Sequence, residues 1–147
     1  MGWVTAVTSV VAAQQASTTG KFNQSIQERN ALIYEQEKER LEGKLNFDLA
    51  RFDEKFRQLQ GETTTKILKS GAELSGSGLR IKRYNAEQAE IEKDIITFNS
   101  KVAQSKKMEQ ANFARMQGQL ARMEARQAEL GYYAQAGQSL MSNYGGG

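Results

Sequence analysis

The sequence predicts an all-α protein: a long antiparallel hairpin of two helices with its tip near residues 71–79, a short additional helix at the N-terminus, and assembly of several copies into a ring. Apolar residues recur at steps of three and four over long stretches, which is the period of one helical face. None of the 147 residues is a proline. The strongest break is the glycine-rich stretch at the tip, because each glycine inside a helix costs about 1 kcal/mol relative to alanine.

Folding about Ser77 predicts which residues face each other. The expected pairs are Leu59 with Ile95, Phe56 with Phe98, Phe52 with Val102, Leu41 with Phe113, and Phe22 with Tyr132. The residues expected to pack the two helices together are Leu41, Leu45, Leu49, Phe52, Phe56, Leu59, Ile91, Ile95, Phe98, Val102, Phe113, Met116 and Leu120. Two helices alone enclose no core, since each has one partner for its apolar stripe, so we expect homo-oligomers.

Composition narrows the possible chemistry. The chain has no cysteine and no histidine, and its net charge is a mild +3. The usual metal ligands and the usual general base are therefore missing. We expect no catalytic, cofactor-binding or metal-binding residues, and no enzymatic activity.

Charge divides the chain into three parts. Every charged side chain lies between Lys21 and Glu129. The expected divisions are an uncharged N-terminal segment (1–20), the helical hairpin (21–130) and an uncharged Tyr/Gly-rich tail (131–147). In a hairpin the two uncharged segments meet. The residues proposed to form a membrane or oligomer surface there are Trp3, Val4, Val7, Val10, Val11, Tyr132, Tyr133, Leu140, Met141 and Tyr144.

The N-terminal segment leaves two interpretations open. Its apolar stretch Trp3–Ala13 is 11 residues long, whereas a single bilayer span needs about 20. It also lacks the basic leader of a secretory signal. The segment either packs against other subunits through its small residues, or enters a membrane as part of an oligomer with its Thr/Ser face turned to water.

The tip is basic. Arg80, Lys82 and Arg83 fall in the first turns of the second helix, where the helix dipole favours acids. Lys66 and Lys69 lie at the end of the first helix, which suits cations. Together these five residues form the basic tip, and they indicate an acidic protein surface or phosphate as partner. An exposed, merely soluble turn is the other interpretation.

Several stretches resemble a known family. These are the opening Met1-Gly2-Trp3, the long polar helix, the turn Gly76-Ser77-Gly78-Leu79-Arg80-Ile81-Lys82-Arg83, and the helix from Glu87-Gln88 to Asn99. They resemble the smallest internal virion protein of short-tailed bacteriophages (podoviruses of the autographivirus type), over the start of the chain and about residues 60–100. Family members usually continue further beyond the position of residue 130.

The resemblance implies a core or ejection protein that sits on the portal inside the capsid. Such a protein contacts the portal and the other core proteins. It leaves the virion with the genome and forms part of a channel for DNA in the host outer membrane. Two alternatives remain open. One is a purely structural adaptor between portal and core, with the basic tip on an acidic rim and no membrane step. The other is non-specific binding of double-stranded DNA through the basic tip.

Overall fold

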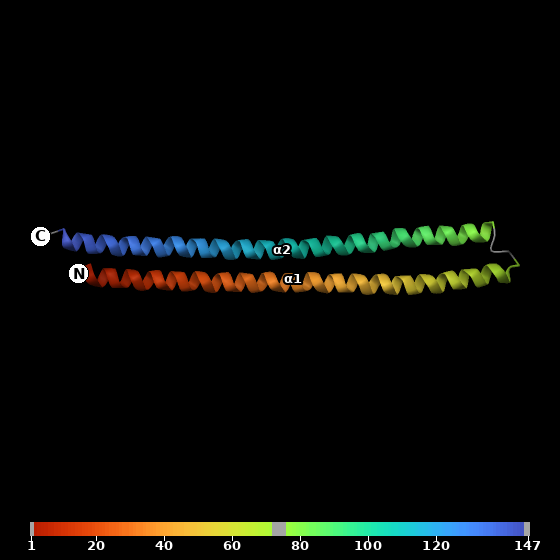
Figure 1. Ribbon diagram of the computed structural model, residues 1–147, viewed down its shortest axis with the longest axis horizontal. Coiled ribbons are helices and arrows are strands. Elements are labelled where there is room, and N and C mark those ends of the chain that lie inside the picture. The colour runs from red at the N-terminus through yellow and green to blue at the C-terminus, as the bar shows by residue number, and fades with distance from the viewer. Residues whose placement is uncertain (1, 72–75, 146–147) are drawn as a thin grey trace. The chain divides into compact units, whose positions relative to one another are not determined.

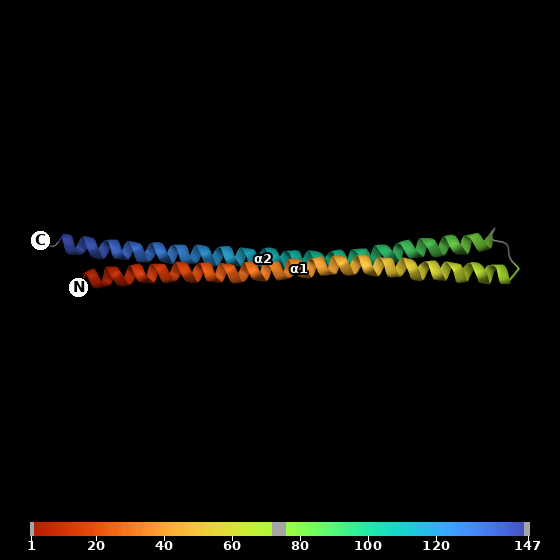
Figure 2. The ribbon, with the colours of Figure 1, turned by 60° about the horizontal axis from the view of Figure 1, so that its bottom comes forward.

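The computed structural model describes residues 2–71 and 76–145, which form two helices of 68 residues each: α1 (Gly2–Lys69) and α2 (Ser77–Tyr144). The helices are antiparallel and lie side by side in both views (Figures 1 and 2). No strand occurs in these two ranges. The predicted all-α hairpin is confirmed.

The chain divides into two compact units. The terminal unit combines Met1–Glu35 with Met108–Gly147, and the tip unit is Gln36–Lys107. Each unit contains one stretch of α1 packed against one stretch of α2.

Small side chains pack the helices of the terminal unit together. Ala31 and Ala111 are fully buried and, with Ala114, form a cluster against which Tyr34 packs. Gly20 approaches Ala125 so closely that an added Cβ would lie well inside the 3.0 Å that real Cβ atoms respect. A Cβ on Gly118 would lie 3.1 Å from Cβ of Gln27. Glycine and alanine therefore set the distance between the two helices here.

In the tip unit, isolated apolar residues and polar contacts connect the helices. Leu45, Ile67 and Ala89 are buried. Nζ of Lys93 lies 3.0 Å from a carboxylate oxygen of Asp53, and Nζ of Lys107 lies 2.6 Å from one of Glu37. The side-chain amide of Gln60 donates a hydrogen bond to the backbone carbonyl of Lys82 at 3.1 Å.

Two glycines in the left-handed region flank the turn. The N–H of Ser70 donates to the carbonyl of Lys66, and Gly71 then adopts a φ of 77°. Gly76 has a φ of 66°, and its carbonyl accepts from the N–H of Arg80 at the start of α2. A side chain would be strained at either glycine, which explains why glycine stands there. The tip falls in the predicted place.

The predicted register is wrong by about nine residues, roughly two and a half helical turns. Phe52, Phe56 and Leu59 surround a shared groove with Asn85, Gln88 and Ala89, instead of meeting Val102, Phe98 and Ile95. In the terminal unit Gly20 faces Ala125, and Phe22 is 65% exposed instead of packing on Tyr132. The chain therefore folds back several residues before Ser77.

Most of the predicted packing residues do not lie between the helices. Leu45 is buried, and Leu41, Leu49, Phe52 and Phe56 are half-buried. The exposed ones are Leu59, Ile91, Ile95, Phe98, Val102, Phe113, Met116 and Leu120. In the terminal unit a second stripe of Ala, Gly and Ser has similar spacing on the inward side, and its small residues let the backbones approach closely. Helical spacing alone does not tell which of two such stripes is turned inward.

The expected separate N-terminal helix is wrong, and the hairpin helices extend beyond the expected limits at residues 21 and 130. Helix α1 continues from Gly2 through Gly20 and Lys21 without a break, and α2 continues past Leu130 to Tyr144. The limits at residues 20 and 130 are therefore changes in charge within continuous helices.

Candidate interaction surfaces

The outward side of α2 presents two apolar stripes. The tip stripe consists of Ile91, Ile95, Phe98 and Val102, which are 41–68% exposed. The terminal stripe consists of Phe113, Met116, Leu120 and Met123, which are 50–59% exposed. Helix α1 adds the exposed residues Phe22, Ile26, Ile33 and Phe47. Contiguous exposed apolar surface of this kind is typical of sites that bind protein or membrane.

The inward residues explain why the stripes point outward. Ala111, Ala114 and Gly118 are buried against α1, and the terminal stripe occupies the other side of the same turns. Residues spaced by three or four stay on one face of a helix. Turning Phe113 or Leu120 inward would push apart helices that are spaced for alanine and glycine.

The two uncharged segments meet in the terminal unit and form an apolar groove of about 260 Å³. Its walls are Ala6, Val7, Val10, Val11, Ala136 and Leu140. The structure thus brings together three of the valines named from sequence with Leu140. Val4, Tyr132, Tyr133, Met141 and Tyr144 are exposed in the same unit, while the side chain of Trp3 lies outside the described part of the structure.

Three hydroxyl groups of the N-terminal segment donate hydrogen bonds to their own helix. Thr8 donates to the carbonyl of Val4 at 2.9 Å, Ser9 to Thr5 at 2.8 Å, and Thr18 to Gln14 at 2.9 Å. These hydroxyl donors have partners without water, which lowers the cost of moving them into an apolar environment. Over residues 2–71 and 76–145, neither helix contains a stretch that is both long and apolar enough to cross a bilayer.

The five residues of the basic tip lie on the two helices beside the turn. Lys66 and Lys69 lie in the last turn of α1, and no acidic residue occupies the first turn of α2. Lys66, Lys69, Arg80 and Arg83 are exposed, and Lys82 is half-buried. Four exposed cations therefore lie close to one turn. Because α2 begins at Ser77, Arg80 falls in its first turn, where the dipole disfavours a cation, and Lys82 and Arg83 fall in the second.

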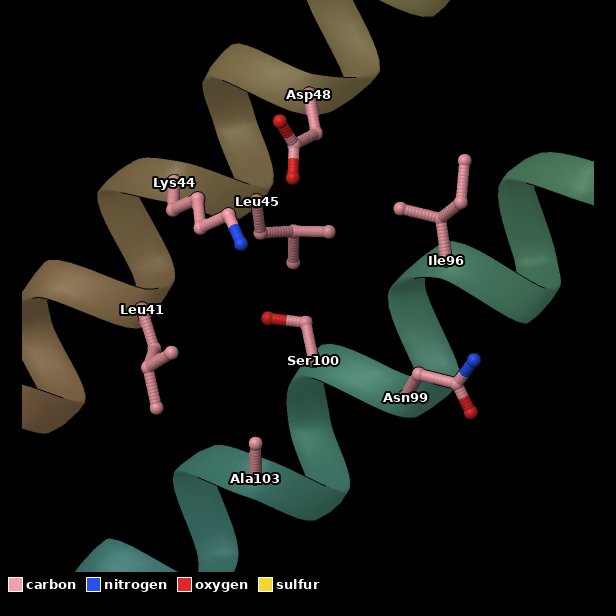
Figure 3. A pocket seen from close by; sticks show the side chains of 8 residues that line it. All are labelled: Leu41, Lys44, Leu45, Asp48, Ile96, Asn99, Ser100 and Ala103. Atoms are coloured by element: carbon pink, nitrogen blue, oxygen red, sulfur yellow. The ribbon is translucent and has the colours of Figure 1, made fainter.

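A mixed groove of about 330 Å³ lies between the helices of the tip unit (Figure 3). It is lined by Leu41, Lys44, Leu45, Asp48, Ile96, Asn99, Ser100 and Ala103. An activated serine needs a base within hydrogen-bond reach. The hydroxyl of Ser100 instead accepts a hydrogen bond from the side-chain amide of Gln104, one turn away on α2. The groove offers polar and apolar contacts and no activated nucleophile.

The surroundings of Lys93 on α2 change its pKa. The hydrogen bond from Lys93 to Asp53, with the negative charge of that carboxylate, raises the pKa of Lys93 above its ordinary value of 10.5. Lys93 therefore remains charged and links the two helices at neutral pH. Across the described residues, no group of three or more Asp, Glu, His or Cys side chains is placed to hold a metal ion.

Comparisons with protein-family models, with curated proteins and with solved structures find no match for this chain. The described residues form a helical hairpin with apolar stripes exposed on the outward side of α2. A narrower assignment depends on the resemblance carried by the turn and the opening residues.

Proposed function

We propose that this chain is an internal core or ejection protein of a short-tailed phage. It packs at the portal in the virion, leaves with the genome, and forms part of a channel for DNA in the host outer membrane. The observation that supports the proposal most is the exposure of the tip and terminal stripes of α2 on a hairpin whose terminal unit packs through alanine and glycine. The resemblance of the turn Gly76–Arg83 to the phage family gives this assembly its context.

The accessible area supports self-association. The chain exposes 10996 Å² for a mass of 16.4 kDa, whereas a compact monomer of that mass exposes about 7,500 Å². An excess of roughly 3,500 Å² is in the range that obligate oligomers bury at their interfaces. Packing into a ring would cover the stripes of α2 with neighbouring copies or with other core proteins.

The uncharged segments support the membrane step. The stretch from Gly2 to Gly20 is about 28 Å long at 1.5 Å per residue, close to the roughly 30 Å of a bilayer's hydrocarbon core. One such helix is too polar to insert alone. In an oligomer, Val4, Val7 and Val11 would face lipid, and the Thr/Ser face would line a lumen.

Dye release from vesicles of phosphatidylethanolamine and phosphatidylglycerol tests the membrane step. The full chain should release dye, and a variant without residues 2–20 should not. Val11→Asp should also abolish release, because it places a charge on the lipid-facing side. Thr19→Asp adds the same charge on the Thr/Ser face and should leave release largely intact. Equal leakage from the full chain and the deletion variant would exclude the N-terminal segment as the membrane element.

The basic tip supports a second candidate, an adaptor that docks on an acidic rim of the portal or core. Its specific observation is the set of exposed cations at an α2 start that lacks acids. Reversing Arg80 and Arg83 to glutamate should reduce incorporation of the protein into particles, whereas Lys55→Glu, an exposed position outside the tip, should not. Normal incorporation of the tip variant would remove this candidate.

A further inference from the structure

We propose that the tip stripe of α2 pairs with the tip stripe of a second copy of this chain, with the two α2 helices antiparallel. This inference concerns residues 87–106 alone. It does not depend on the phage assignment or on the membrane step.

The stripe is an unpartnered seam of coiled-coil type. Ile91, Ile95, Phe98 and Val102 are separated by four, three and four residues and are exposed. Lys93 and Ser100, on the same turns, are half-buried toward α1. The alternation of three and four is the a/d pattern of coiled coils, in which each side chain inserts between residues of the facing helix.

The spacing of four, three and four residues is the same in either chain direction, so two copies of the stripe can pair across a twofold axis. With the axis between Ile96 and Thr97, Ile91 meets Val102 of the second copy, and Ile95 meets Phe98. Both central layers are then apolar on both sides. A twofold interface uses one patch twice, so no other sequence is needed to complete it.

The charges beside the seam determine the direction. One edge carries Glu87, Asp94 and Lys101, and the other carries Glu92, Asn99 and Lys106. Members of each edge are seven residues apart, and all are exposed. Acids lie in the first half of each edge and lysines in the second.

Antiparallel pairing satisfies these charges, and parallel pairing does not. In the antiparallel arrangement Asp94 meets Lys101 of the second copy, and symmetry repeats the contact. In the parallel arrangement Glu87 would face Glu92, and Lys101 would face Lys106, two like-charge contacts on each side of the dimer. The terminal stripe lacks such a gradient. Its edges carry the neutral Gln110, Asn112, Gln117 and Gln119, and its charged neighbours Glu124 and Arg126 lie at the same end and have opposite signs. Direction is therefore encoded in the tip stripe.

Disulfide trapping tests the pairing in the full chain, which has no cysteine of its own. Ile91→Cys combined with Val102→Cys should form a covalent dimer under mild oxidation. The two sites are about 16 Å apart along one helix, beyond the roughly 7 Å limit between bridged Cα atoms, so a bridge within one chain is excluded. Ile91→Cys alone is the matched control, because its thiols meet only in a parallel, in-register pair. The proposal would be overturned if the Ile91→Cys/Val102→Cys variant stayed monomeric under oxidation. It would also be overturned if Ile91→Cys alone formed as much covalent dimer as the double variant.

Charge reversal gives an independent test, because it should change the dissociation constant of the dimer in opposite directions for antiparallel and parallel pairing. Lys101→Glu should raise the dissociation constant of the dimer about tenfold at low salt, because two attractive contacts with Asp94 become repulsive. Adding Asp94→Lys should restore the affinity. Sedimentation equilibrium measures both, with Lys55→Glu as the control for net charge. Tighter association of Lys101→Glu would indicate parallel pairing, since the new carboxylate would face Lys106, and would refute the antiparallel seam.

Discussion

Replacing Gly20 with alanine should destabilise the terminal unit, although the same change in an open part of a helix stabilises. Alanine is favoured over glycine in a helix by about 1 kcal/mol. At Gly43 an added Cβ meets nothing within 4 Å, so Gly43→Ala should gain roughly that amount. At Gly20 the added Cβ would overlap Cβ of Ala125 on the facing helix.

The overlap determines the magnitude. Forcing an extra methyl group into a packed interface typically costs about 1–3 kcal/mol. After the gain in helix propensity, Gly20→Ala should lower the free energy of unfolding by up to about 2 kcal/mol, while Gly43→Ala raises it by up to about 1 kcal/mol. Ala125→Gly should rescue Gly20→Ala, because it moves the methyl group from one helix to the other and leaves the total volume unchanged.

Urea titration followed by circular dichroism at 222 nm gives the midpoints of these variants. Hydrogen exchange of peptides from the terminal unit then shows where stability is lost. The expected order of stability is Gly43→Ala, wild type, then Gly20→Ala, with the Gly20→Ala/Ala125→Gly pair close to wild type. If Gly20→Ala were as stabilising as Gly43→Ala, the helices would not approach closely at residue 20, and the small-residue interface would be refuted.

Three further outcomes follow from individual contacts. The pKa of Lys93 is raised in the folded state, so its contact with Asp53 stabilises the fold fully at pH values below the ordinary pKa of 10.5. This stabilisation is lost as the pH rises through the raised pKa. In thermal melting, Lys93→Met should lack that loss. Ala31→Leu, at a fully buried position, should cost about 1–3 kcal/mol by overpacking, whereas Ser25→Leu at an exposed position of the same helix should change the urea midpoint little. Any binding of duplex DNA by the basic tip should weaken with salt with a log–log slope no steeper than about −4.5 for five contacts, and a steeper slope in fluorescence anisotropy would place phosphate contacts elsewhere.

The sequence predicted the fold because its strongest signals are local. The absence of proline, the long three-and-four periodicity and the glycines of the turn each act on the backbone where they occur. Gly71 and Gly76 adopt left-handed conformations. Helix α1 ends two residues before Gly71, and α2 begins directly after Gly76. The positions of the five cations beside the turn follow from the position of the turn itself.

The register and the inward face were not predictable from apolar periodicity. Helix α2 carries large apolar residues such as Phe113 and Leu120 on one side, and small residues such as Ala114 and Gly118 on another. Both sets have helical spacing, and larger side chains usually mark the core. The useful signal was the recurrence of small residues in both helices, at Ala6, Ala13 and Gly20 and again from Ala111 to Ala125, since two such faces match only each other.

Packing through small residues separates two properties that most helical proteins combine on one face. In the terminal unit alanine and glycine hold the two helices at a short distance but bury little apolar area, so the large apolar residues outside offer more hydrophobic free energy than the interface inside. Contacts of this chain with other molecules can therefore change without repacking the hairpin. A protein that exchanges a protein environment in the virion for a lipid environment in the host would need that property, because its outward residues change neighbours while its inward face keeps the same ones. This separation connects the alanine and glycine interface to the proposed function.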